Sequence, residues 1–423
     1  MSVDSYCMPM VDIDAPTTED ELARFRQLQA QFARSFSAIF DDPALPRTVL
    51  IVPSLSLDQQ VLTKIPGVHH YEERMLCLLL LLRMPRTRVI YVTSTAISET
   101  VIDYYLHLLP GVPEVHARRR LTLISCNDAS QAPLTRKILD RPRILARIRD
   151  AIPDLASAHM TCFTVTELER KLALALRVPI YGCDPSLLHW GSKSGSRKII
   201  RESGIDLPFG FEDLIDGDQV ADALAELKGR KPDLHRAVVK LNEGFSGEGN
   251  AIFHFAAAPA GASLLPWVRD SLPAMAFEAR GMTWELYQDK LRTMGGIVEE
   301  FIPGTVKRSP SAQFRIDPVG GIDAVSTHDQ VLGGTNRQIF LGCRFPAVST
   351  DWTSKRAAPK SPKHLPAKAS SVDSASISYR CKTLMLGAIL RSRSTSGRVV
   401  PLIRSSCSSS LPTATTRPTR ASF

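Results

Sequence analysis

The chain has 423 residues, of which 44% are hydrophobic and 22% charged, as is ordinary for a globular protein of about two or three domains. Its net charge of +9 belongs to the C-terminal end, because residues 352–423 hold 13 Lys and Arg against one acidic residue. Residues 1–351 hold 39 basic and 42 acidic side chains. The composition of this main body therefore gives no support to nucleic-acid binding.

The eight cysteines are scattered, and they form neither a Cys-x-x-Cys pair nor a Cys/His cluster with zinc spacing. A reduced, cytoplasmic protein is the simpler expectation for such a chain. The acidic N-terminus lacks the apolar segment of a signal peptide. The longest apolar run, Met75–Leu82, is far shorter than the ~20 residues that span a bilayer, so we expect a buried helix and no membrane partner.

The first predicted element is an amphipathic helix within an N-terminal lead, residues 1–44. Thr18 and Glu21 have the spacing of a capping box. Apolar residues recur at helical spacing from Leu22 to Phe40.

Residues 45–188 alternate between two kinds of segment. Short, apolar runs typical of buried strands begin at Thr48, Thr87, Arg120, Ala158 and Val178. Helical segments lie between them, and one of these is expected to run from residue 135 to residue 152. The alternation is typical of βαβ units and predicts an α/β domain on a parallel sheet.

Residues 189–347 have a different character and predict an α+β nucleotide-binding domain. A helix over "SGSRKIIRESG" is expected to stop at Gly204, since glycine is the usual residue after a helix C-terminus. The segment "AVVKLNEGFSGEGNAIFHF" predicts a hairpin with a glycine-rich turn, and further strands are expected in "GGIVEEFIPG" and "IDAVSTHDQVLGG".

The glycine-rich turn follows a lysine, Lys240, at the end of the predicted strand. Glycines let backbone N–H groups approach a phosphate, and a lysine supplies a compact positive charge for the same group. An ordinary hairpin turn is the alternative interpretation of this stretch. Neither a P-loop nor a dinucleotide-binding glycine motif is present.

Two flanking features favour a nucleotide site. Upstream, Lys193 opens the helix that ends at Gly204, and downstream "VEEFIPG" places Glu299 and Glu300 on an apolar strand. This ordered set resembles the ATP-grasp superfamily. The resemblance implies phosphate binding by Lys193 and Lys240, a flap over the phosphates, and an adenosine-binding strand. The flap residues would be Ser246, Gly247 and Gly249, and the adenosine-binding residues Glu299, Glu300, Phe301 and Ile302.

The likeness is closer to one branch, the pheganomycin-type peptide ligases. It extends from about Leu45 to Ala347 and includes "DYYLHLLPG", "YGCDPSLLHWGSKSGSRK" and "HDQVLGGTNRQIFLGCRFPA". The resemblance implies a pre-ATP-grasp domain, residues 45–188, followed by an ATP-grasp domain, residues 189–347. It also implies ATP and Mg²⁺ as cofactors and small-molecule carboxylate and amine or peptide substrates, which would be joined through an acyl phosphate.

Three further residues are candidates for this chemistry. Arg315 is the catalytic candidate, for the acyl phosphate or the ATP phosphates, although an ordinary strand-face arginine is the alternative. Strand alternation predicts His328 and Gln330 on one face, where they could line the substrate cleft. A structural role for this histidine is the alternative.

The resemblance also implies a C-terminal motif that the chain lacks. In this branch a "GRFxVDF" strand precedes "EINLRxGGTTHPF", and their oxygen ligands bind magnesium. No Glu follows Glu300, and after residue 347 the only acids are Asp351 and Asp373. We therefore assign no metal ligand in this chain and expect an incomplete ATP-grasp domain.

A one-base slip in the reading frame accounts for this loss. Read from the third base of each codon, the codons from Arg391 onward permit I-E-I-N-L-R-x-G-G-T-T-H-P-F. Those from Pro362, in the same frame, permit a segment containing G-R-F-G-V-D-F. We hypothesise that the basic, Ser-rich tail, residues 348–423, is frameshifted and disordered, which resequencing of the locus tests. The alternative is a natural disordered extension that binds nucleic acid.

These observations predict an ATP-dependent carboxylate–amine ligase-like protein with weak or no turnover. A non-catalytic nucleotide-binding or interaction protein is the alternative. Cleft shape sets substrate choice, so the sequence names neither the carboxylate nor the amine, and it leaves the oligomeric state open.

Overall fold

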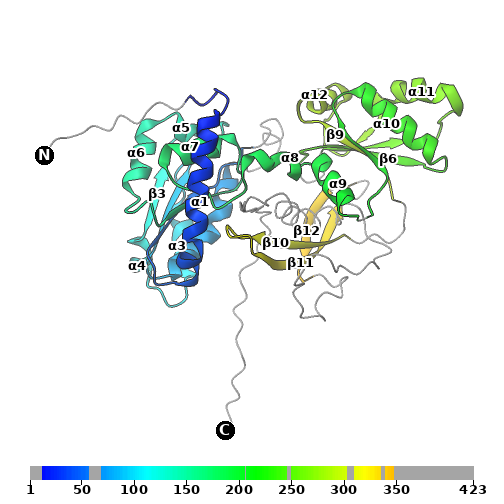
Figure 1. Ribbon diagram of the computed structural model, residues 1–423. Helices are drawn as coiled ribbons and strands as arrows, with labels where there is room; N and C mark the ends of the chain where they lie inside the picture. The colour runs from blue at the N-terminus through cyan, green and yellow to red at the C-terminus, as the bar shows by residue number, and fades with distance from the viewer. Residues whose placement is uncertain are drawn as a thin grey trace, which may run out of the picture.

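The computed structural model describes residues 12–56, 68–204, 206–244, 249–302, 309–334 and 339–346. Figure 1 shows a helix-flanked sheet in the N-terminal part, from which α8 and α9 lead to the sheet that contains β6 and β9. Within the described ranges, no helix is both long and apolar enough to cross a membrane. The predicted tail, residues 348–423, lies outside these ranges.

The chain begins with α1 (Glu19–Asp41), whose predicted capping box is confirmed. The Thr18 hydroxyl accepts the Glu21 N–H at 3.2 Å, and the Glu21 carboxylate accepts the Thr18 N–H at 2.8 Å. Phe25 is fully buried, which places the apolar face of α1 in the first core.

The predicted parallel sheet is confirmed, with strand order β3-β2-β1-β4 and every pairing parallel. Its strands are β1 (Arg47–Val52), β2 (Thr87–Thr93), β3 (Leu121–Ser125) and β4 (Ala158–Cys162). The surrounding helices are η1 (Val68–Arg83), α3 (Glu99–His107), α4 (Glu114–Arg118), α5 (Leu134–Leu139), α6 (Pro142–Asp150) and α7 (Glu167–Leu176).

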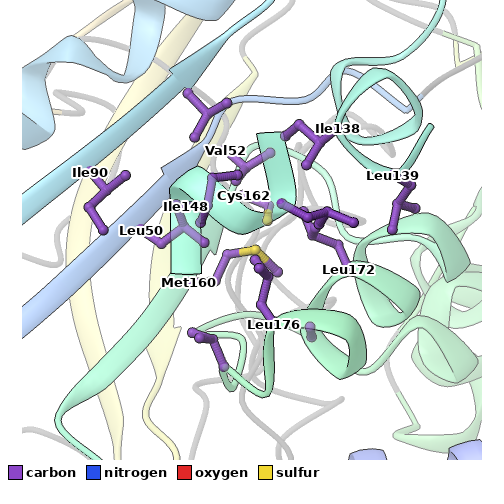
Figure 2. Packing of buried hydrophobic residues seen from close by; sticks show 14 of the residues in the cluster. Leu50, Val52, Ile90, Ile138, Leu139, Ile148, Met160, Cys162, Leu172 and Leu176 are labelled. Atoms are coloured by element: carbon purple, nitrogen blue, oxygen red, sulfur yellow. The ribbon is translucent and has the colours of Figure 1, made fainter. Parts of the chain in front are cut away.

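Helices bury both faces of this sheet, because alternate residues of each strand point to opposite sides. Leu50 and Val52 pack with α5, α6 and α7, a core that Figure 2 shows around Met160 and Leu172. Val49 and the other residues of β1 and β2 that point to the opposite face of the sheet pack with η1 and α3.

Two details of the predicted α/β domain were wrong. The helical segment expected over 135–152 is two helices, because Pro142 has no N–H to continue the first and instead opens α6. The strand expected from Val178 is reduced to one parallel bridge between Met160 and Ile180. Pro179 lies beside this bridge and cannot donate to a strand ladder.

Three connecting helices lead out of the first domain: η2 (Pro185–Leu187), α8 (Leu188–Gly191) and α9 (Lys193–Glu202). Gly204 follows α9 with a φ of 67°, as the prediction of a glycine stop requires.

An antiparallel sheet of order β5-β9-β6-β7-β8 follows, and it confirms the predicted α+β character. Its strands are β5 (Gly210–Leu214), β6 (Arg236–Leu241), β7 (Asn250–His254), β8 (Ala276–Phe277) and β9 (Gly296–Glu300). The associated helices are α10 (Gly217–Arg230), η3 (Gly261–Ser263), α11 (Leu264–Ser271), η4 (Leu272–Ala274) and α12 (Trp284–Met294).

A third, antiparallel sheet comes last in the described chain. It contains β10 (Pro310–Ile316), β11 (Ile322–Gly333) and β12 (Ile339–Arg344) in that order. The fold class is thus the predicted one: a parallel α/β sheet followed by an α+β part.

Candidate nucleotide-binding site

Strand register divides the second sheet into a core face and a face that carries charge. Val239 and Val298 pair across β6 and β9 and pack with α10, α11 and α12. The alternate residues, Lys240 and Glu299, therefore project to the opposite face. Both are buried, with 8% and 4% of their surfaces exposed. Two of the side chains predicted to bind ATP, those of Lys240 and Glu299, thus share one side of the sheet.

Lys240 and Glu299 form an ion pair there, between Nζ and Oε1. The other oxygen of Glu299 accepts a hydrogen bond from Arg197 Nη1 of α9 at 2.7 Å. Burial alone would raise the pKa of Glu299, but Lys240 and Arg197 outweigh it and hold that pKa below its ordinary value. Glu299 is therefore an ionised carboxylate between two cations.

Lys193 approaches the end of the β6–β7 hairpin from α9, whose first residue it is. Its ammonium donates to the Leu241 carbonyl at 2.7 Å and lies 3.4 Å from the Gly244 carbonyl. The helix N-terminus that carries Lys193 is capped by Ser192, whose hydroxyl accepts the Gly195 N–H at 3.0 Å. The two predicted phosphate-binding lysines thus lie at the same end of the hairpin.

The glycines at the two ends of the flap are close together. A Cβ added to Gly244 would lie 2.7 Å from the Cα of Gly249, so side chains are excluded there. Tyr287 of α12 donates its hydroxyl to the Gly249 carbonyl at 3.0 Å. Ser246 and Gly247, predicted between these glycines, lie outside the described residues.

The predicted adenosine strand sends its side chains to two different faces. Phe301 is buried with Val238 and Ile252 on the same face as Glu299. Glu300 points the other way, where it pairs with Lys231 and accepts the Phe209 N–H at 2.8 Å. A contact from Glu300 to adenosine would therefore come from its backbone.

The last residue of this predicted set, Ile302, is 40% exposed beyond the end of β9. Adenosine binding by residues 299–302 stays a prediction.

The remaining candidates lie on the third sheet. Arg315 is in β10, but its side chain is outside what the structure describes. His328 and Gln330 share one face of β11, as alternation predicts. His328 lies 3.1 Å from the Ser326 hydroxyl, and Gln330 accepts the Ser309 hydroxyl at 3.0 Å. Burial lowers the pKa of His328. The catalytic role of Arg315 and the substrate-cleft role of the other two stay predictions.

Two polar residues at the site were missed in the sequence. Asn242 accepts the Ser194 N–H at 2.9 Å and donates to the Met294 carbonyl at 3.0 Å, so it ties α9 to the strand ends. Arg197 joins α9 to β9 through Glu299. Its signal was the i, i+4 spacing from Lys193, which places both cations on one helix face.

A bound metal is a separate question. Among the residues with described positions, no group of three or more His, Cys, Asp or Glu side chains gathers as a metal site would require.

Parts of this chain are similar to known proteins. Residues 186–259, which include α9 and the β6–β7 hairpin, match the protein family described as "IQCH-like, ATP-grasp". The L-propargylglycine–L-glutamate ligase of Streptantibioticus cattleyicolor is 29% identical over 71% of this chain and 61% of its own length. The IQ motif-containing protein H of Danio rerio is 23% identical over 78% of this chain and 35% of its own length. The chain thus spans about three fifths and one third of these curated relatives.

Solved structures give weaker likenesses. An N5-carboxyaminoimidazole ribonucleotide synthetase, solved with ADP, has a TM-score of 0.39 and 13% identity over 73% of this chain and 59% of that one. D-alanyl-alanine synthetase A of Vibrio cholerae has a TM-score of 0.33 and 8% identity over 68% of each chain. The family match over residues 186–259 and the ligase relative confirm the resemblance predicted from the sequence, to the ATP-grasp superfamily and its branch of pheganomycin-type ligases.

Proposed function

We propose that this chain binds ATP on the charged face of the second sheet. The observation that carries the proposal is the buried Lys240–Glu299 pair, beside Lys193 and two closely apposed glycines, on the face that α10, α11 and α12 leave free. A buried ammonium needs a negative partner, and a phosphate oxygen can replace a carboxylate oxygen in that role. The glycine-rich turn offers N–H groups for the same phosphates.

The reaction that such a site supports is carboxylate–amine ligation. The γ-phosphoryl group of ATP would pass to a carboxylate oxygen, and ADP would leave. An amine would then attack the carbonyl carbon of the acyl phosphate, the C–O bond to phosphate would break, and the amine would lose a proton as the amide forms. Lys193 and Lys240 would hold the phosphates by charge and orientation.

Turnover by this chain is proposed to be weak or absent. Phosphoryl transfer requires charge neutralisation, which Mg²⁺ supplies when oxygen ligands hold it. Among the described residues no group of three or more His, Cys, Asp or Glu side chains gathers, and no Glu follows Glu300 in the sequence. A nucleotide-binding protein without catalysis is accordingly the second candidate function.

Binding is tested by thermal unfolding with and without ATP, since a ligand that binds only the folded state raises the unfolding temperature. We expect ATP to protect the wild-type chain and to protect Lys240→Met much less. Lys231→Met is the matched control, because Lys231 pairs with Glu300 on the other face of the same sheet. Equal protection of both variants would refute the proposed site.

Turnover is tested separately, by phosphate release with ATP and a panel of amino acids and short peptides. ATP protection without phosphate release would support the non-catalytic alternative. Rapid, amine-dependent phosphate release would contradict the proposed loss of turnover and support an intact ligase.

A further inference from the structure

We propose that Arg197 is a positioning residue of the nucleotide site, which keeps Glu299 ionised and in place when Lys240 exchanges that carboxylate for a phosphate of ATP. The inference rests on the proposed ATP binding and deepens it. It assigns a role to an arginine that need not touch the nucleotide.

The contacts of Arg197 fit this role. The guanidinium donates from Nη1 to Glu299 at 2.7 Å, from Nε to Glu212 at 2.6 Å, and from Nη2 to the Pro208 carbonyl at 2.7 Å. These acceptors belong to β9, to β5 and to the segment just before β5, while Arg197 itself is in α9. Only 5% of its side chain is exposed. A planar guanidinium can make three such bonds in fixed directions, which a lysine cannot.

The charges follow an alternating order that explains the need for Arg197. Lys240 pairs with Glu299, Glu299 with Arg197, Arg197 with Glu212, and Glu212 with Arg201. When a phosphate recruits Lys240, Glu299 loses that cation and keeps its contact with Arg197. A buried carboxylate without a cation tends to take up a proton, because burial disfavours its charged form.

Arg197 prevents that protonation because a guanidinium stays charged at every ordinary pH. Among the described side chains, Arg197 of α9 and Lys240 of β6 contact Glu299, and Glu212 of β5 is linked to it through Arg197. From a further neighbour, α10, the buried side chains are apolar and pack on the opposite, core face. Arg197 is therefore a cation that stays beside Glu299 throughout binding.

Proton linkage separates this role from simple structural support. ATP binding would be measured by titration calorimetry from pH 6 to pH 8, in two buffers of different ionisation enthalpy, for the wild type and Arg197→Gln. We expect the variant to take up as much as one more proton per ATP than the wild type. Its affinity should fall at pH 8 by tenfold or more and recover toward pH 6, since protonation of Glu299 releases Lys240.

The matched control is Arg201→Gln, which makes the same substitution one helical turn later, at a side chain that is 53% exposed and contacts Glu212. It should leave the proton count at the wild-type value. Arg197→Lys keeps the positive charge and loses the planar set of guanidinium donors. It should also keep the wild-type number of protons taken up per ATP, while its ATP affinity falls. If Arg197→Gln does not fold, Arg197→Lys is measured in its place, and extra proton uptake in that variant would overturn the inference, because its charge beside Glu299 is kept.

The outcomes separate the two proposals. Failure of the wild-type chain to bind ATP would overturn the proposed function and this inference with it. ATP binding by the wild type, with the same proton count and affinity in Arg197→Gln, would overturn the inference alone. The same extra proton uptake in Arg197→Gln and Arg201→Gln would also overturn it, because the effect would then not be specific to the cation beside Glu299.

Discussion

Two adjacent glutamates offer the sharpest test of the charge arrangement. Glu299 has 6% of its side chain exposed and lies between Arg197 and Lys240, which are 5% and 10% exposed. Its neighbour Glu300 pairs with Lys231, whose side chain is 42% exposed. The substitutions Glu299→Gln and Glu300→Gln remove the same charge from consecutive positions of one strand, so they differ only in environment.

The expected magnitudes follow from that difference in burial. Removing one partner of a buried ion pair costs about 3–5 kcal/mol, because the remaining charge stays desolvated without compensation. An ion pair with a partly exposed partner contributes about 0–1 kcal/mol. At about 2–4 °C per kcal/mol for a domain of this size, Glu299→Gln should lower the unfolding temperature by roughly 6–20 °C and Glu300→Gln by at most about 4 °C.

The assay is thermal unfolding followed by circular dichroism, at one protein concentration and without nucleotide. A wild-type-like unfolding temperature for Glu299→Gln, or equal losses for the two variants, would refute the reasoning. Either result would mean that Lys240 and Arg197 are not held as a buried pair of cations around Glu299.

Three further predictions concern other parts of the chain. Burial, together with the nearby Arg47 cation, lowers the pKa of His159 from 6.5 to about 3. The unfolded chain therefore binds a proton at His159 that the folded chain does not bind. The free energy of unfolding should fall as the pH drops from 6.5 toward 3, by up to about 5 kcal/mol. In urea unfolding, His159→Leu should lose less unfolding free energy between pH 7 and pH 5 than the wild type does. Equal losses in the two proteins would contradict this account. Gly195→Ala would place a Cβ 2.2 Å from the His189 carbonyl oxygen, so its unfolding temperature and ATP protection should both fall, whereas Gly229→Ala, with nothing within 4 Å, should be neutral or stabilising by up to about 1 kcal/mol. Thr18→Ala should cost about 0.5–2 kcal/mol by removing the cap of α1, and a change in ATP affinity in this variant would contradict a purely structural role.

Local patterns were enough to predict most elements of the fold. The alternation of apolar runs and helical segments gave the parallel sheet, and glycines and a capping box gave the ends of helices, because these signals act between residues close in sequence. Prediction failed where a proline decided the outcome, as at Pro142 and Pro179. At these positions, the lack of a backbone N–H donor in proline outweighed a favourable apolar pattern.

The sequence by itself also determined which residues are candidates for the site, through the order of Lys193, Lys240 and Glu299 and its likeness to the ATP-grasp superfamily. Only the tertiary structure decided how they act together. Strand register places Glu299 and Lys240 on one face and Glu300 on the other, and the packing of α9 brings Arg197 to Glu299 across 102 positions of the chain. Such pairings depend on how whole elements pack, since contact between distant charges requires both burial and register, and neither is encoded in the spacing of the residues alone.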